Sequence, residues 1–153
     1  MDNREKILES ALDLFYTKGY DAVGVQEIVD RAGVTKPTLY HYFGSKYGLL
    51  ECLTKEYFDR FEAQMTEASQ YMGDLPLTLY RFVKTCFNLT AYDARFCRFF
   101  MSMLYSAEET DTYKVVKPFA DKQLALLTSV FLEAGNVIGN MNGRQEQYAL
   151  TNS

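Results

Sequence analysis

Apolar residues recur at helical spacing from the start of the chain. Between residues 3 and 18 they lie three or four positions apart and share one helical face: Ile7, Leu8, Ala11, Leu12, Leu14 and Phe15. Asp2 followed by Glu5 is typical of a capping box, and Gly19 directly after Lys18 is typical of a helix end. The pattern therefore predicts a first helix over residues 3–18.

Two short helices are predicted next. One apolar face is formed by Val25, Ile28, Val29 and Ala32. Gly24 stands at the N-cap position of this helix, and Gly33 ends it. The following helix begins at Thr35, which is a good N-cap residue, and it ends at Gly44. Pro37 lies in its first turn, where a missing N–H does no harm.

The remaining pattern is also helical. Ser45 predicts the cap of a fourth helix that runs to about Tyr71, and later helices are expected at about 76–92, 94–105 and 111–134. Pro118 should kink the last of these or mark its true start. Residues 136–143 predict a loop, and residues 144–151 have the composition of a helix start. No stretch alternates with period two, so the fold class is all-α.

Charge narrows the choice of partners. The net charge of −4 does not favour attraction of the whole protein to nucleic acid. Between Arg31 and Leu50, however, the only charged residues are the basic Arg31, Lys36 and Lys46. Any binding to nucleic acid must therefore use a local basic face.

Several classes of protein are disfavoured. Cys52, Cys86 and Cys97 are widely spaced and His41 is the only histidine, so no metal site or disulfide framework is expected. We find no nucleophile and base at useful spacing, and we expect no enzyme, no catalytic residue and no cofactor. The charged N-terminus and the lack of a long apolar stretch predict a cytoplasmic protein without membrane contact.

The two short helices form a helix-turn-helix pattern. Leu39 and Phe43 share one stripe of the second short helix and should pack inward, which leaves Lys36, Thr38, Tyr40 and His41 facing outward. A helix about 13 Å long with such a face can lie in the major groove of DNA.

The residues of this region resemble a known family. Residues 32–43 (AGVTKPTLYHYF), followed by Ser45-Lys46 and Leu49-Leu50, resemble the DNA-binding signature of the tetracycline-repressor (TetR) family. The resemblance implies a helix-turn-helix domain over residues 1–46 and a helical effector-binding and dimerisation domain over residues 47–153. The chain departs from the family at Gly24, where Thr is usual, and at Val29, where Ala is usual.

The resemblance also implies roles for single residues. Contacts with bases or flanking phosphates are expected from Gln26, Thr35, Lys36, Thr38 and Tyr40. Tyr42 and Lys46 match positions that clamp the phosphate backbone, and His41 is expected to lie near phosphate. A small apolar effector would suit an aromatic and Met lining formed by Phe61, Tyr80, Phe96, Phe99, Phe100, Met103 and Phe119. A plain hydrophobic core is the alternative for each of these seven residues.

The function implied is an effector-controlled transcription regulator, more often a repressor, that binds a palindromic duplex operator as a homodimer. Members of this family commonly continue with two further long helices. The chain is therefore expected either to be a shortened form or to dimerise differently, through residues 111–134 and those after 143. The alternative is an interaction protein of the same fold that pairs with another regulator and binds DNA poorly alone.

Overall fold

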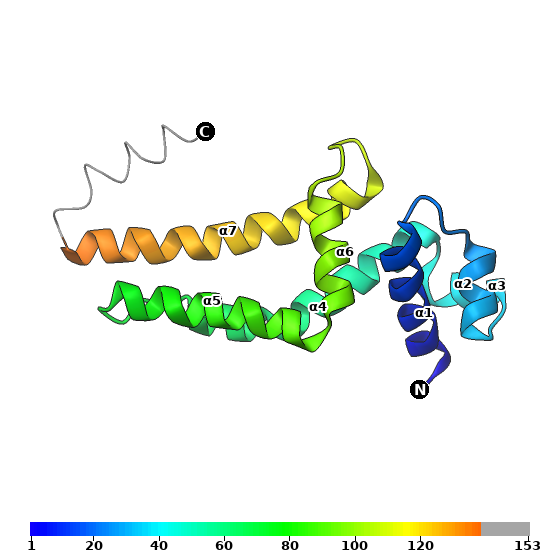
Figure 1. Ribbon diagram of the computed structural model, residues 1–153, viewed down its shortest axis with the longest axis horizontal. Coiled ribbons are helices and arrows are strands. Elements are labelled where there is room, and N and C mark those ends of the chain that lie inside the picture. Colours follow the sequence, from blue (N-terminus) through cyan, green and yellow to red (C-terminus); the bar gives the residue numbers. More distant parts are fainter. Residues whose placement is uncertain (139–153) are drawn as a thin grey trace. The chain divides into compact units, whose positions relative to one another are not determined.

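The fold is all-helical, as the hydrophobic pattern predicts. A computed structural model describes residues 1–138, and every regular element in that range is a helix (Figure 1). The elements are α1 (Asn3–Lys18), α2 (Val25–Ala32), α3 (Lys36–Phe43), α4 (Lys46–Ala68), α5 (Leu75–Tyr92), α6 (Ala94–Leu104) and α7 (Asp111–Ile138).

The predicted caps fix the first three helices. Asp2 and Glu5 form the reciprocal capping box of α1. Gly33 ends α2 in the left-handed conformation, with φ of 66° and ψ of 36°. The Thr35 hydroxyl accepts a hydrogen bond from the backbone N–H of Thr38 and caps α3. These local signals determine where the helices begin and end because they satisfy backbone groups that the helix itself leaves unpaired.

The last helix differs from its prediction. It extends past residue 134, so Asn136 is helical, whereas a loop was predicted there. Pro118 lies inside α7 and does not mark its start. A proline inside a helix loses its N–H hydrogen bond and crowds the carbonyl oxygen four residues earlier, but the buried side chains of Val116 and Val130 hold α7 on both sides of it. The rest of the predicted loop and residues 144–151 lie outside the described residues.

By packing, the chain divides into two compact units. Unit 1 comprises residues 1–61 and 89–120. In it α1 packs against α2, α3 and α6. The ring centroids of Phe15 on α1 and Phe99 on α6 lie 5.7 Å apart, so α6 shares the core of the helix-turn-helix. The functional division expected after residue 46 stays a prediction.

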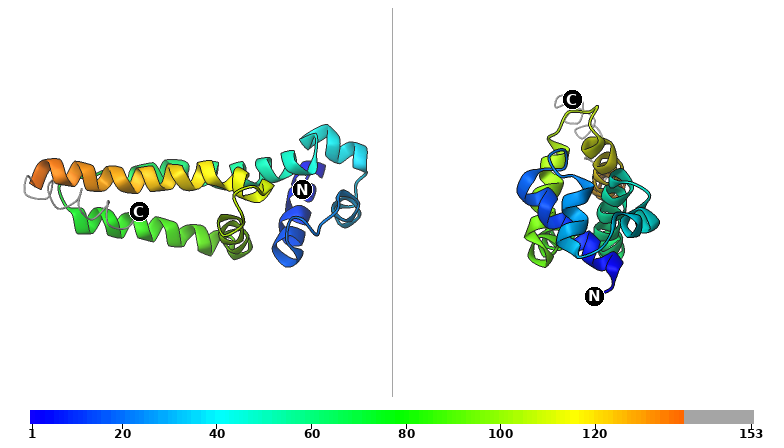
Figure 2. Two further views of the ribbon diagram at one scale, coloured as in Figure 1. Left: turned by 90° about the horizontal axis from the view of Figure 1, so that it is seen from above. Right: turned by 90° about the vertical axis from the view of Figure 1, so that its right-hand side faces the viewer.

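Unit 2 comprises residues 62–88 together with the described residues from 121 onward. It contains the end of α4, most of α5 and the later part of α7. Figures 1 and 2 show α5 and α7 as long helices. Each of the three contributes to its interior through Met65, Ala68, Thr78, Phe82, Val130 and Ala134. Arg81 on α5 donates a hydrogen bond of 2.9 Å to the carbonyl oxygen of Glu67, which holds α5 against the end of α4.

Candidate nucleic-acid interface

Helix α3 separates its residues cleanly between core and solvent. Leu39 is fully buried and Phe43 nearly so. Tyr40 and Tyr42 keep 46% and 43% of their surface exposed, and His41 is exposed beside them. The His41 and Tyr42 rings meet edge to face at 5.4 Å between centroids. The outer face is therefore a polar, aromatic surface fixed from beneath by two apolar side chains.

Hydroxyl and amide groups lie at the start of this surface. The Thr35 and Thr38 hydroxyl oxygens are 2.9 Å apart, and the Thr35 oxygen also serves as the cap of α3. Gln26, the second residue of α2, donates a hydrogen bond of 2.7 Å to an Asp30 carboxylate oxygen. A DNA contact by Gln26 would therefore compete with an acid one helical turn away.

The local basic face is narrower than the sequence indicates. Arg31 forms an ion pair with Asp13 of α1, so its charge is compensated. Lys46 is turned toward the protein backbone. Within residues 31–50, Lys36 is the basic side chain that stands exposed at the first position of α3 without such a contact. Positive charge on this face is thus concentrated at the N-terminus of α3, where the helix dipole adds to it.

Lys46 joins α4 to the turn between α1 and α2. Its ammonium group donates hydrogen bonds of 2.9 Å to the carbonyl oxygens of Tyr20 and Val23, and it lies 4.1 Å from the centre of the Tyr20 ring. Burial, with lesser effects from Asp111 and Asp21, raises the pKa of Tyr20 to about 12, so its ring stays neutral under the cation. The phosphate contact expected of Lys46 stays a prediction that must use the remaining N–H.

Gly48 permits close contact between α3 and α4. Its backbone N–H donates to the Ser45 hydroxyl at 2.9 Å, which confirms Ser45 as a cap. A Cβ atom placed on Gly48 would lie 2.2 Å from the carbonyl oxygen of Phe43, the last residue of α3. Our sequence interpretation did not identify Gly48. A glycine in the first turn of an otherwise regular helical pattern was the only available signal.

Comparison with known proteins identifies the region just described. Residues 7–53 match the family described as "Bacterial regulatory proteins, tetR family". The chain belongs to the TetR family. Over 107 residues it is 31% identical to the HTH-type transcriptional activator FasR of Mycolicibacterium smegmatis, a match that covers 70% of this chain and 49% of that protein.

Two further relatives support the assignment. The chain is 37% identical over 62 residues to the HTH-type transcriptional repressor ComR of Escherichia coli, covering 40% of this chain and 30% of ComR. The crystal structure of the TetR family transcriptional regulator PfmR from Thermus thermophilus superposes with a TM-score of 0.67 at 27% identity, covering 87% of this chain and 71% of that one. The chain thus spans about half the length of FasR, and less of ComR.

An ionic network in this TetR-family chain links α1 to its neighbours. Arg95 of α6 lies 2.7 Å from a Glu9 oxygen, 3.6 Å from an Asp13 oxygen and 2.8 Å from an Asp93 oxygen. Asp13 in turn pairs with Arg31 of α2. The hydrogen bonds to Asp93 and Glu9 raise the pKa of Arg95, which therefore keeps its charge. The network runs from α6 through α1 to the helix-turn-helix.

Asp93 has a second partner on α4. The Tyr57 hydroxyl donates to it at 2.9 Å, and the backbone N–H of Arg95 donates to it as the cap of α6. Burial alone would raise the pKa of Asp93, but the hydrogen bonds from Arg95 and Tyr57 outweigh burial and lower it. Burial, helped by the bond to Asp93, raises the pKa of Tyr57.

The seven residues expected to line an effector pocket do not all lie in the same unit. Tyr80 lies in unit 2 and is largely exposed, whereas the other six belong to unit 1. Phe96, Phe99 and Met103 are buried in the core that α6 shares with α1. Phe58 stacks on Phe119 with ring centroids 4.7 Å apart. The effector-pocket assignment stays a prediction.

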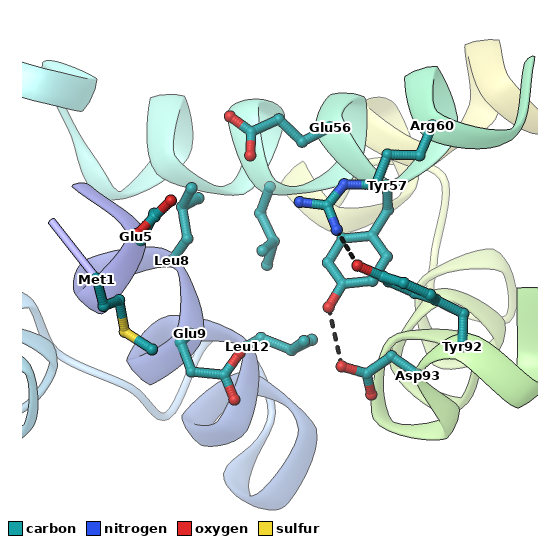
Figure 3. Close-up of a pocket in the computed structure, with 11 residues that line it drawn as sticks. Met1, Glu5, Leu8, Glu9, Leu12, Glu56, Tyr57, Arg60, Tyr92 and Asp93 are labelled. Carbon is teal, nitrogen blue, oxygen red and sulfur yellow. Dashed lines mark hydrogen bonds between the residues drawn. The ribbon is translucent and has the colours of Figure 1, made fainter.

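A cavity of about 470 Å³ lies in unit 1, beside α1, α4 and the end of α5. Figure 3 shows the residues that line it: Met1, Glu5, Leu8, Glu9, Leu12, Leu53, Glu56, Tyr57, Arg60, Tyr92 and Asp93. None of the seven predicted pocket residues is among them. The hydrophobic pattern contains no signal for this cavity because its lining comes from three helices that are far apart along the chain.

The described residues carry neither a membrane span nor a cluster of metal ligands. None of the helices within 1–138 is both long and apolar enough to cross a bilayer. Over the same range, no three or more His, Cys, Asp or Glu side chains are grouped so that they could hold a metal ion.

Proposed function

We propose that this TetR-family chain is a transcription regulator that binds duplex DNA by placing α3 in the major groove. The observation that carries the proposal is the division of α3 between two faces. Leu39 and Phe43 fix the inner face of α3 in the core, whereas Lys36, Tyr40 and His41 are exposed to solvent. A short helix held in this way can offer side chains to base edges without losing order.

The exposed groups suit different parts of the DNA. Lys36 and the N-terminus of α3 favour phosphate, and the Thr38 hydroxyl can donate to or accept from a base edge. Tyr42 has a partly packed ring and an exposed position, which suits a hydroxyl contact with the backbone. Lys46 contributes chiefly by holding the α1–α2 turn, and thereby Gln26, in register with α3.

The proposal includes a two-fold dimer on a palindromic operator. A single module buries only about 600–1,000 Å² on DNA, which favours pairing of two copies whose α3 helices lie about 34 Å apart or a multiple of it. Helix α7 offers an apolar surface for such pairing, since Leu124, Leu132 and Val137 are 63%, 60% and 70% exposed. An unpaired surface of this kind is an aggregation liability.

Control by a small apolar effector is part of the same proposal. The aromatic cluster of Tyr57, Phe58, Phe96 and Phe100 adjoins the helix-turn-helix core, with Tyr57 and Phe96 stacked at 3.9 Å between centroids. A ligand that moved these rings would act directly on α6 and α1. A rise in the melting temperature of the intact chain on adding apolar ligands tests this part of the proposal separately.

Selection of bound sequences from a random duplex library tests DNA binding. We expect enrichment of one sequence with two inverted half-sites, protected from cleavage in two adjacent major grooves. A library that stays random through repeated rounds at moderate salt would contradict the proposal, because binding through phosphates alone selects no sequence.

A further inference from the structure

Arg95 uses all three of its guanidinium nitrogens. The Nε and Nη2 atoms donate hydrogen bonds of 3.2 and 2.8 Å to the two oxygens of Asp93, the cap of α6. The Nη1 atom lies 2.7 Å from a Glu9 oxygen and 3.6 Å from an Asp13 oxygen, both on α1. The paired hydrogen bonds to Asp93 fix the plane of the guanidinium group, so the third nitrogen reaches α1 from a set position.

Asp93 is itself held from α4. The Tyr57 hydroxyl donates to it at 2.9 Å, as Figure 3 shows, and the Tyr57 ring stacks on Phe96 of α6 with 3.9 Å between centroids. Because Asp93 is the N-cap of α6, it cannot shift without the first turn of that helix. The position of the Arg95 guanidinium group therefore follows the packing of α4 against α6.

Asp13 is shared between two arginines from different helices. One of its oxygens pairs with Arg31 of α2, and the other faces Arg95 of α6. Glu9 lies one turn before Asp13 on α1, a spacing at which like charges repel. Removing either arginine leaves Asp13 with the other one, whereas removing both leaves two neighbouring acids without these cations.

The value of each contact in this group depends on the others. The side chains of Arg95, Asp13 and Arg31 keep 33%, 24% and 52% of their surface exposed, and a single ion pair at such exposure contributes little because solvent screens it. A network with a bidentate arginine differs, since one ordered side chain makes several contacts. Residues joined in this way are expected to lose stability non-additively when they are replaced.

We propose that Asp13 couples the position of α6 to that of α2, and that Arg95 is a positioning residue for the helix-turn-helix. With Arg95 in place, α1 is fixed on α6 and Asp13 is aligned with Arg31. Without Arg95, Arg31 alone faces the two acids of α1, so the setting of α2 on α1 changes. The consequence for DNA binding rests on the proposed function, so the first test is made without DNA.

A double-mutant cycle on the melting temperature of the whole chain tests the coupling. We expect Arg31→Gln and Arg95→Gln together to lose at least about 2 °C more than the sum of the two single losses, because Asp13 is then left with neither cation. Lys18→Gln is the matched control, since Lys18 joins α1 to Glu27 of α2 by an ion pair outside this network. Its loss should add to that of Arg95→Gln within about 1 °C.

Two conditions separate shared charge from general packing. In an Asp13→Asn background the losses of Arg31→Gln and Arg95→Gln should be additive, and in about 1 M NaCl the excess loss should shrink by about half or more. Additive losses in the parent chain at low salt would overturn the inference. An excess loss that persists in Asp13→Asn, or that is undiminished at high salt, would also overturn it, because that excess would arise from packing.

DNA binding gives the functional readout. Arg95→Gln should lower the ratio of affinities for a selected duplex and for a scrambled duplex about fivefold, at a temperature where the variant is fully folded. Loss of its charge alone would weaken both duplexes equally. An unchanged ratio would overturn the positioning role of Arg95. A parent chain that selects no duplex would contradict the proposed function, and the cycle without DNA would still test the coupling.

Discussion

The backbone of Gly48 passes so close to the carbonyl oxygen of Phe43 that a Cβ atom at residue 48 would lie 2.2 Å from that oxygen. Phe43 is the last residue of α3, and Gly48 lies in the first turn of α4. The α3–α4 connection is thus as tight as the backbone permits. It sets where the outer face of α3 points relative to α4.

We predict that Gly48→Ala destabilises the fold by about 2–3 kcal/mol, because the carbonyl oxygen belongs to the backbone and cannot turn away as a side chain would. Urea denaturation measures the change. Gly24→Ala is the matched control, since nothing lies within 4 Å of its added Cβ. The control should cost about 1 kcal/mol or less, the difference between glycine and alanine at an N-cap. Equal losses in the two variants would refute the role of the close contact.

Lys46 and Lys36 should differ in how they affect DNA binding. Lys36→Ala removes an exposed charge, so we expect the salt slope of binding to fall by about 0.9 with an unchanged melting temperature. Lys46→Ala removes the two hydrogen bonds to Tyr20 and Val23, so we expect a loss of about 1–2 kcal/mol in stability and a smaller change in slope. Binding measured by fluorescence anisotropy over a salt series gives both slopes. A full unit of slope lost in Lys46→Ala, with normal stability, would instead support direct phosphate contact.

Asp93 should make stability depend on acid pH. A carboxyl whose pKa is lowered by folding stabilises the protein above its unfolded-state pKa, and it loses that contribution as the pH falls through the folded-state value. Asp93→Asn keeps a good N-cap and removes the charge. We expect it to cost about 2 kcal/mol at pH 7, with the difference from the parent chain fading as the pH falls below the ordinary pKa of an aspartate, about 4. A difference that stays constant as the pH falls would show that the charge of Asp93 does not stabilise the fold.

Self-association should be reversible and should depend on α7. Sedimentation over a range of concentrations is expected to show a monomer–dimer equilibrium, weakened by Leu132→Glu on the exposed face of α7. Glu133→Gln, a neighbouring exposed change without added charge, serves as control. A strict monomer that still bound a palindrome tightly would contradict the argument from groove spacing, and a monomer that binds DNA poorly would favour the alternative of an interaction protein.

What the sequence predicts well is local. The caps at Asp2, Thr35 and Ser45 act within three residues, and the burial of Leu39 and Phe43 follows from helical spacing alone. Such features depend on neighbours along the chain, so the pattern contains them. The exposed face of α3 followed directly from that reasoning.

The features missed are long-range. Lys46 meets a carbonyl 26 residues earlier, and Arg95 meets acids on α1. The cavity needs α1, α4 and the end of α5 together. No periodicity encodes these distances, because they arise only when the helices pack.

Recognition of a DNA sequence by the outer face of α3 can be measured as a ratio of two affinities. These are the affinities for the selected duplex and for a scrambled duplex of the same composition, each measured in the parent chain and in Tyr40→Ala. We predict a ratio of at least about 10³ for the parent chain at physiological salt, and a much smaller ratio for the variant with little change in affinity for the scrambled duplex. A ratio near one for the parent chain, or a ratio that both Tyr40→Ala and Thr38→Val leave intact, would contradict sequence recognition by α3.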